Sequence, residues 1–116
     1  MENKLRAVIS VRIFSDDKCF GPGIATLLTR VRELRSLRAA AISIGMAYSK
    51  AWTIIRNSET HLGFKLLHST TGGKNGGGAE LTPEAEAMLA AYEDYCRELR
   101  ARGEELFAEK FAQFLK

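Results

Sequence analysis

The sequence feature that most constrains the fold is Gly45, which lies between two segments of helical periodicity. Ser36 is a credible N-cap for the first segment, whose inner face has apolar residues at helical spacing: Leu37, Ala40, Ala41 and Ile44. Glycine takes the left-handed conformation that ends many helices without a steric penalty, so we expect the first helix to end at Gly45. A second helix from about Tyr48 to His61 completes a helix-turn-helix. Taken alone, this pattern is weak evidence, because many antiparallel helix pairs contain it.

A β-hairpin with a glycine-rich tip is predicted directly after the second helix. Residues 64–69 have the short apolar pattern of a strand, and residues 79–81 are the expected return strand. Between them lie five of the ten glycines of the sequence, around Lys74 and Asn75. A phosphate-binding P-loop is excluded by its spacing, because His68 stands in place of the first glycine and Asn75 in place of Ser or Thr. A helix-turn-helix followed by such a hairpin is the outline of a winged helix-turn-helix domain, which binds DNA.

The two faces of the second predicted helix differ in chemistry. Its outer face carries hydrogen-bond donors and small hydroxyls without a carboxylate, which suits a polyanion. We expect that face to contact the major groove of DNA, through Ser49, Lys50, Thr53, Arg56 and Asn57. An ordinary solvent face is the alternative, although such faces usually include Glu or Asp. Tyr48 and Trp52 lie at the border between the faces, and we expect Trp52 to pack in the core.

Charge is distributed unevenly along the chain, although the net charge is only +3. Residues 1–17 are neutral overall, residues 18–79 carry +7 and residues 80–116 carry −4. The basic section contains the elements predicted to contact DNA, which fits a surface that faces phosphates. A solvated charged face is the alternative, and charge segregation alone does not exclude it.

A strand and a helix are predicted before the helix-turn-helix. Apolar and polar residues alternate from Leu5 to Ile13, the period of a half-buried strand, and Asp16 and Asp17 interrupt the pattern. The turn Phe20-Gly-Pro-Gly23 can begin a helix, which then has one apolar face: Ile24, Leu27, Leu28, Val31 and Leu34. The expected fold class is therefore α+β, mostly α with a small β-hairpin and an N-terminal strand.

A long helix is predicted after the hairpin. Thr82 can cap it, Pro83 suits its first position, and Glu84 and Glu86 favour the positive end of its dipole. Gly103 weakens the helix, so we expect a bend or an end there. The apolar stripe of this helix is longer than one small core can cover, so we expect a homodimer through Met88, Leu89, Tyr92, Tyr95, Leu99 and Leu106. Fraying, or folding back of the stripe onto its own domain, is the alternative.

Composition and spacing exclude several classes of protein. No stretch approaches the roughly 18 apolar residues that span a bilayer. Arg6 and Arg12 interrupt the apolar N-terminal stretch, which argues against a secretory signal and for a cytoplasmic protein. Cys19 and Cys96 are isolated, so two reduced thiols are expected rather than a disulfide or a metal site. No metal-ligand, nucleophile or paired-carboxylate pattern emerges, so we expect no cofactor, no metal and no enzymatic activity.

A resemblance to a known family rests on three motifs: Phe20-Gly-Pro-Gly23, Gly45-Met-Ala-Tyr-Ser-Lys-Ala-Trp52 and Thr70-Thr-Gly-Gly-Lys-Asn-Gly-Gly-Gly-Ala-Glu-Leu-Thr82. They are similar to the N-terminal winged-helix domain of ModE-type regulators, molybdate-responsive transcription factors related to LysR-type regulators. The resemblance implies a recognition helix that includes Tyr48, Ser49, Lys50 and Trp52. It also implies that residues 71–78 form the wing, with Thr71, Lys74 and Asn75 at phosphates or the minor groove, and that the helix after Thr82 mediates dimerisation.

Two features depart from that family. His68 stands where the family commonly has Arg, which weakens an expected phosphate contact. Full-length ModE proteins continue into molybdate-binding domains, whereas this sequence ends at Lys116, so no response to molybdate is expected, and the sequence identifies no small-molecule effector.

The predicted function is sequence-specific binding of double-stranded DNA by a homodimeric transcriptional regulator, with molybdenum-related genes as the candidate targets. Residues 1–81 are assigned to the DNA-binding domain and residues 82–116 to a dimerisation helix of the same structural unit. The main alternative is a protein-interaction module that keeps the winged-helix fold without binding DNA. The carboxylate-free face of the second helix favours DNA.

Overall fold

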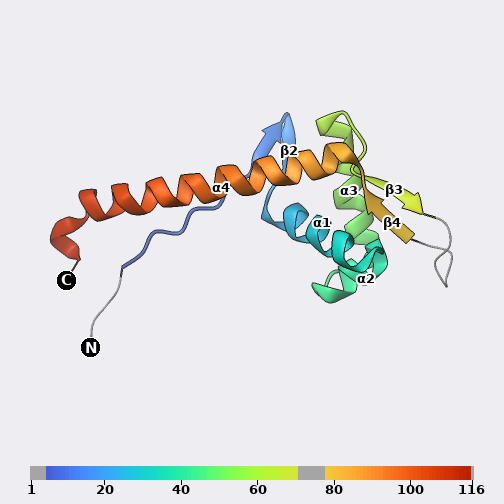
Figure 1. The fold of residues 1–116 in the computed structure, drawn as a ribbon, viewed down its shortest axis with the longest axis horizontal. Helices are drawn as coiled ribbons and strands as arrows, with labels where there is room; N and C mark the ends of the chain where they lie inside the picture. Colours follow the sequence, from blue (N-terminus) through green and yellow to red (C-terminus); the bar gives the residue numbers. More distant parts are fainter. Residues whose placement is uncertain (1–4, 71–77, 116) are drawn as a thin grey trace.

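The computed structural model describes residues 5–70 and 78–115, in which helices alternate with two antiparallel strand pairs. In chain order the elements are β1 (Ile13–Ser15), β2 (Asp17–Phe20), α1 (Pro22–Leu34), α2 (Leu37–Ser43), α3 (Tyr48–Leu62), β3 (Leu67–Thr70), β4 (Gly78–Leu81), α4 (Pro83–Lys110) and the short 3-10 helix η1 (Ala112–Phe114). Figure 1 shows α1, α2 and α3 grouped beneath the first part of α4, with β3 and β4 on the side away from the C-terminus. The expected α+β fold is confirmed.

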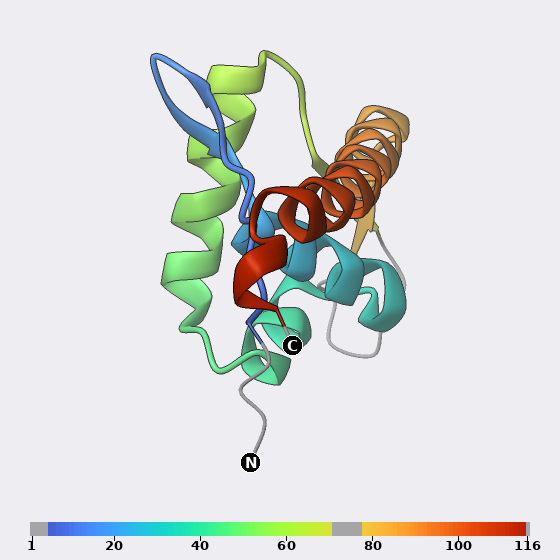
Figure 2. The ribbon, with the colours of Figure 1, turned by 90° about the vertical axis from the view of Figure 1, so that its left-hand side faces the viewer.

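The N-terminal strand predicted over residues 5–13 is wrong, because only β1 pairs with a second strand. Residues 5–12 are an irregular segment that runs beside α4 (Figures 1 and 2). The phenol of Tyr92 on α4 donates a hydrogen bond of 2.7 Å to the carbonyl of Val11. The alternation of apolar residues therefore marks a segment with one packed side, but a period of two does not require a partner strand.

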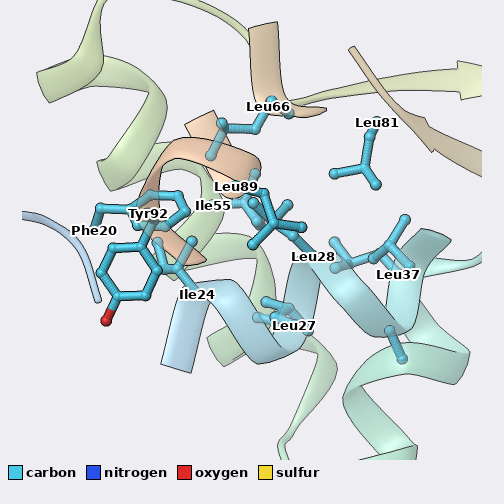
Figure 3. Close-up of a cluster of buried hydrophobic side chains, with 14 of the residues drawn as sticks. Phe20, Ile24, Leu27, Leu28, Leu37, Ile55, Leu66, Leu81, Leu89 and Tyr92 are labelled. Carbon is cyan, nitrogen blue, oxygen red and sulfur yellow. The ribbon is translucent and has the colours of Figure 1, made fainter. Parts of the chain in front are cut away.

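The core lies between α1, α3 and α4, as Figure 3 shows. α1 begins at Pro22 as predicted, and most of its predicted apolar face is buried: Ile24, Leu27, Leu28 and Val31. Leu34 is 44% exposed, contrary to the expectation, because the helix ends there and Arg35 turns the chain with a φ of 58°. The rings of Phe20 and Tyr92 meet edge to face at 5.0 Å and connect β2 to α4.

The predicted helix-turn-helix is confirmed. Ser36 caps α2, and its hydroxyl accepts a hydrogen bond of 3.0 Å from the amide three residues later. Ala40 and Ala41 are completely buried, which lets α3 pack closely across α2. Gly45 has a φ of 69°, so it takes the left-handed conformation that the sequence predicts at the turn.

The predicted hairpin is also confirmed, although its first strand begins at Leu67 rather than at Phe64. Leu67 lies opposite Leu81 in the antiparallel register. The amide of Ala79 donates a hydrogen bond of 3.1 Å to the carbonyl of Arg35, which attaches the hairpin to the connection between α1 and α2.

α4 begins as the sequence predicts, since Thr82 accepts a hydrogen bond of 3.0 Å from the amide of Ala85 and Pro83 follows the cap. The expected interruption at Gly103 is wrong, because α4 continues through this residue. A Cβ on Gly103 would lie 2.6 Å from Cδ1 of Ile9, so the glycine permits close approach of the N-terminal segment. Within the described residues, no helix is both long and apolar enough to cross a membrane.

Candidate nucleic-acid interface

α3 presents one polar face to solvent. Ser49, Lys50 and Thr53 are exposed, whereas Ala51 and Ile55 on the opposite side are completely buried. Arg56 and Thr60 extend the exposed face toward the end of the helix. We name this set (Ser49, Lys50, Thr53, Arg56 and Thr60) the outer face of α3. A helix with a row of exposed donors is the element that helix-turn-helix domains place in the major groove.

The only carboxylate in the sequence of α3, Glu59, is directed away from the outer face. Its side chain is only 12% exposed, and one carboxylate oxygen accepts a hydrogen bond of 2.8 Å from the amide of Leu66 and a longer one of 3.4 Å from Leu67. The other oxygen lies 3.9 Å from Nζ of Lys65. The acid therefore connects α3 to the start of β3, and the outer face carries no negative side chain to repel phosphates.

Trp52 is not the core residue that the sequence suggested, since it is 38% exposed at the edge of the outer face. Its indole Nε1 donates a hydrogen bond of 2.6 Å to the hydroxyl of Tyr48, and the two rings meet edge to face. Arg56 lies over the indole, with its guanidinium carbon 5.6 Å from the ring centroid. The side chains at i, i+4 and i+8 thus form one contiguous row along α3.

Arg38 is a site residue that the sequence analysis missed. It belongs to α2, but its guanidinium carbon lies 4.2 Å from the centroid of the Tyr48 ring. The row on α3 therefore continues onto the preceding helix and has a cation at each end. The sequence shows only that α2 has one basic residue on its exposed side. It does not indicate that this residue contacts Tyr48 on the next helix.

Asn57 has a structural contact that the sequence did not predict. Its side-chain amide donates a hydrogen bond of 3.1 Å to the carbonyl of Lys18 in β2, and the hydroxyl of the buried Ser58 donates one to the carbonyl of Cys19. These two residues hold the β1–β2 hairpin on α3. We therefore do not retain Asn57 among the proposed DNA contacts.

The hairpin β3–β4 is positioned as a wing beside the helix-turn-helix (Figure 1). Its predicted DNA contacts Thr71, Lys74 and Asn75 lie outside the described residues. At the base of the wing, a Cβ on Gly78 would overlap the hydroxyl of Thr70, so a larger residue there requires the Thr70 side chain to move.

The residues predicted for a dimer contact on α4 fall into two groups. Leu89 and Tyr92 are buried in the chain's own core, so their assignment to a dimer contact is corrected, whereas Met88 packs against that core and stays partly exposed. Tyr95 is 56% and Leu106 is 54% exposed, and Leu99 is half-buried. The predicted stripe is therefore shared between internal packing in the first half of α4 and an exposed edge in the second half.

The described residues contain no group of three or more His, Cys, Asp and Glu side chains arranged to hold a metal ion. Cys19 and Cys96 are both buried as free thiols.

Comparison with known proteins gives the family. Residues 25–86, from α1 to the first turn of α4, match the bacterial regulatory helix-turn-helix proteins of the lysR family. The chain is 36% identical over 76 residues to the "Molybdenum transport protein ModE" of Herbaspirillum seropedicae, a match that covers 66% of this chain and 27% of the relative. It is 33% identical over 82 residues to the "Transcriptional regulator ModE" of Yersinia pestis, covering 71% of this chain and 29% of the relative.

A third relative is the "Molybdenum-pterin-binding protein MopB" of Rhodobacter capsulatus, which is 38% identical over 66 residues that cover 57% of this chain and 24% of the relative. The chain thus spans less than a third of the length of these relatives. The resemblance to the N-terminal domain of ModE-type regulators is confirmed. With its helix-turn-helix and its wing in place, the chain belongs to the lysR family of bacterial regulatory helix-turn-helix proteins.

Proposed function

We propose that this protein is a homodimeric, sequence-specific regulator whose α3 enters the major groove of duplex DNA. The observation that carries the proposal is the outer face of α3, with Lys50 and Arg56 exposed and the single carboxylate of the helix engaged with β3. Ser49, Lys50, Thr53 and Arg56 are the proposed groove contacts. Tyr48 contributes by its contacts with Trp52 and Arg38, which fix the positions of these side chains.

The proposal includes backbone contacts around the groove. Arg38 on α2 lies at one end of the row on α3 and is suited to a phosphate. The wing residues Thr71, Lys74 and Asn75 remain proposed phosphate or minor-groove contacts on the basis of sequence. A protein-interaction module is the less favoured function, because a basic face without a carboxylate has no negative group to pair with the cations of a mixed protein surface.

The proposed dimer forms through the second half of α4. Figure 1 shows this half extending beyond α1, α2 and α3, with only the N-terminal segment beside it. The exposed Tyr95 lies just before this half, the exposed Leu106 lies within it, and the exposed Phe111 and Phe114 follow at its end. Exposed apolar groups on a projecting helix are typical of a helix that pairs with another chain. A symmetric dimer would present two α3 helices to half-sites about 34 Å apart, or a multiple of that distance.

The relatives suggest which genes are regulated. The names of two of them include the word molybdenum, and another is a ModE transcriptional regulator. We therefore propose target genes for the transport or use of molybdenum.

The test of DNA binding is selection of bound sequences from random duplex DNA, followed by titration of the best site at several salt concentrations. Lys50→Ala or Arg56→Ala should weaken binding by about 1–3 kcal/mol if the side chain contacts a base edge. Lys110→Ala, which removes the same charge at the far end of α4, is the control and should retain wild-type affinity. Failure to select any duplex, or affinity that does not fall with salt, would refute the proposal.

The test of the dimer is Leu99→Asp, which places a carboxylate on the exposed edge of α4 without entering the core cluster. Because an unpaired carboxylate is costly to bury at an apolar contact, the variant should be monomeric and bind DNA much more weakly. Light scattering at micromolar concentration measures the mass. A monomeric wild type would contradict the proposed assembly.

A further inference from the structure

We propose that Trp52 recognises thymine by contact with its methyl group in the major groove, and that Tyr48 positions the indole for this contact. The inference rests on the proposed function, since it requires α3 to lie in the groove. It assigns a specificity-determining role to a residue whose sequence pattern indicated only core packing.

The first step is to identify which groups of the Trp52 side chain are free to contact DNA. Indole has one polar group, the N–H at Nε1, and in this protein that group already donates to the hydroxyl of Tyr48 at 2.6 Å. The side chain is nevertheless 38% exposed. What Trp52 presents outward is therefore an apolar ring without a free donor, on a helix face whose other exposed members are polar.

The second step is that the ring is held in place. Tyr48 meets Trp52 edge to face, with centroids 6.4 Å apart, and the guanidinium of Arg56 lies over the indole ring. Arg38 packs over Tyr48 from α2. The row therefore consists of two aromatic rings with a cation at each end. A ring restrained by neighbours in this way loses little conformational freedom when it meets a ligand.

The third step is what an apolar ring can meet in the groove. The base edges of the major groove present hydrogen-bond donors and acceptors, and the one apolar group among them is the C5 methyl of thymine. Trp52 lies next to Thr53 in the N-terminal part of α3, the part with which a recognition helix contacts the bases. Contact with a thymine methyl is therefore the interaction that fits the exposed indole.

The experiment replaces single thymines of the selected site by deoxyuridine, which removes the methyl group and leaves the base-pairing edge unchanged. For wild-type protein, one such replacement in a single half-site should weaken binding about fourfold, the effect of one buried methyl group. Trp52→Ala should bind more weakly overall and should not distinguish thymine from deoxyuridine at that position. Phe14→Ala, which removes another exposed aromatic ring, should keep the fourfold difference.

The positioning role of Tyr48 has its own readout. Tyr48→Phe removes only the hydroxyl that accepts from the indole, so the deoxyuridine effect should become smaller while the fold is unchanged. Because Trp52 is the single tryptophan of the sequence, its fluorescence reports directly on the ring in each variant that retains it. Emission should change when the duplex binds to wild-type protein.

The outcomes separate the two proposals. If no duplex binds, the proposed function fails. If wild-type protein binds DNA but tolerates deoxyuridine everywhere, or if Trp52→Ala retains the same sensitivity, the thymine contact is overturned while DNA binding stands. If Tyr48→Phe keeps the full fourfold effect, the positioning role of the hydroxyl is overturned.

Discussion

Replacing Glu59 by Gln separates two opposite effects of a carboxylate on a DNA-binding helix. If the charge acted only through repulsion of phosphates, its removal would strengthen DNA binding. The structure predicts the reverse, because the carboxylate is nearly buried and accepts hydrogen bonds from two amides at the start of β3. Weaker attachment of β3 should lower both the stability of the protein and its affinity for DNA.

The magnitude follows from those contacts. The bond from the Leu66 amide is short at 2.8 Å, whereas the bond from Leu67 is long at 3.4 Å, so one strong bond to a charged group dominates. Such a bond contributes about 2 kcal/mol, and a neutral acceptor retains about half of it. Glu59→Gln should therefore lower the free energy of unfolding by about 1 kcal/mol, and Glu59→Ala by about 2 kcal/mol or more because it leaves the amides unpaired. The ion pair with the exposed Lys65 contributes little to the free energy of unfolding.

Urea denaturation at fixed protein concentration measures stability, and fluorescence anisotropy on the selected duplex measures affinity. Glu33→Gln is the matched control, because it changes the net charge equally at an exposed residue of α1 that pairs with Arg30. Its cost should stay below about 0.5 kcal/mol. If Glu59→Gln binds DNA more tightly than wild type at unchanged stability, the carboxylate acts as a charge near DNA and our account of it is wrong.

Two other predictions concern the wing and the core. Gly78→Ala should destabilise the protein by about 1–3 kcal/mol through overlap with the Thr70 hydroxyl, and adding Thr70→Ala should recover most of the loss in thermal unfolding. Burial raises the pKa of the Tyr92 phenol above its ordinary value of 10.0, so the neutral form is favoured in the folded state. The resulting stability is fully present below about pH 10 and declines as the pH rises toward the folded-state pKa, and Tyr92→Phe should lack this decline in urea titrations at successive pH values.

Local sequence signals predicted the elements that local chemistry determines. The cap at Ser36, the left-handed glycine at Gly45 and the cap at Thr82 each depend on neighbours within a few residues, and the structure has all three. The helix-turn-helix and the hairpin follow from these signals. The same reasoning placed a strand in residues 5–13 and failed there, because the partner of that segment is α4, which lies far along the chain.

The chemistry of the candidate site depended more on contacts distant in sequence. Asn57 and Lys50 are similar in the helical pattern, yet a carbonyl of β2 engages Asn57. Arg38 reaches the ring of Tyr48 only because α2 and α3 pack against each other. Periodicity predicts which side of α3 is exposed, but it does not predict which exposed side chains already have partners.

The apolar stripe of α4 illustrates the same limit. From Met88 to Leu106 its residues repeat at one helical spacing, so the sequence offers no boundary between residues that pack internally and residues left for another chain. The structure sets that boundary, because α1 and Phe20 cover Leu89 and Tyr92, while Tyr95 and Leu106 remain exposed. The stripe is long, which was a sound reason to expect that it has more apolar residues than a single core can bury. Because the first half of α4 is needed to close the domain over α1, substitutions there should disturb folding, whereas substitutions on the exposed edge of the second half should change the proposed dimer contact without loss of the fold.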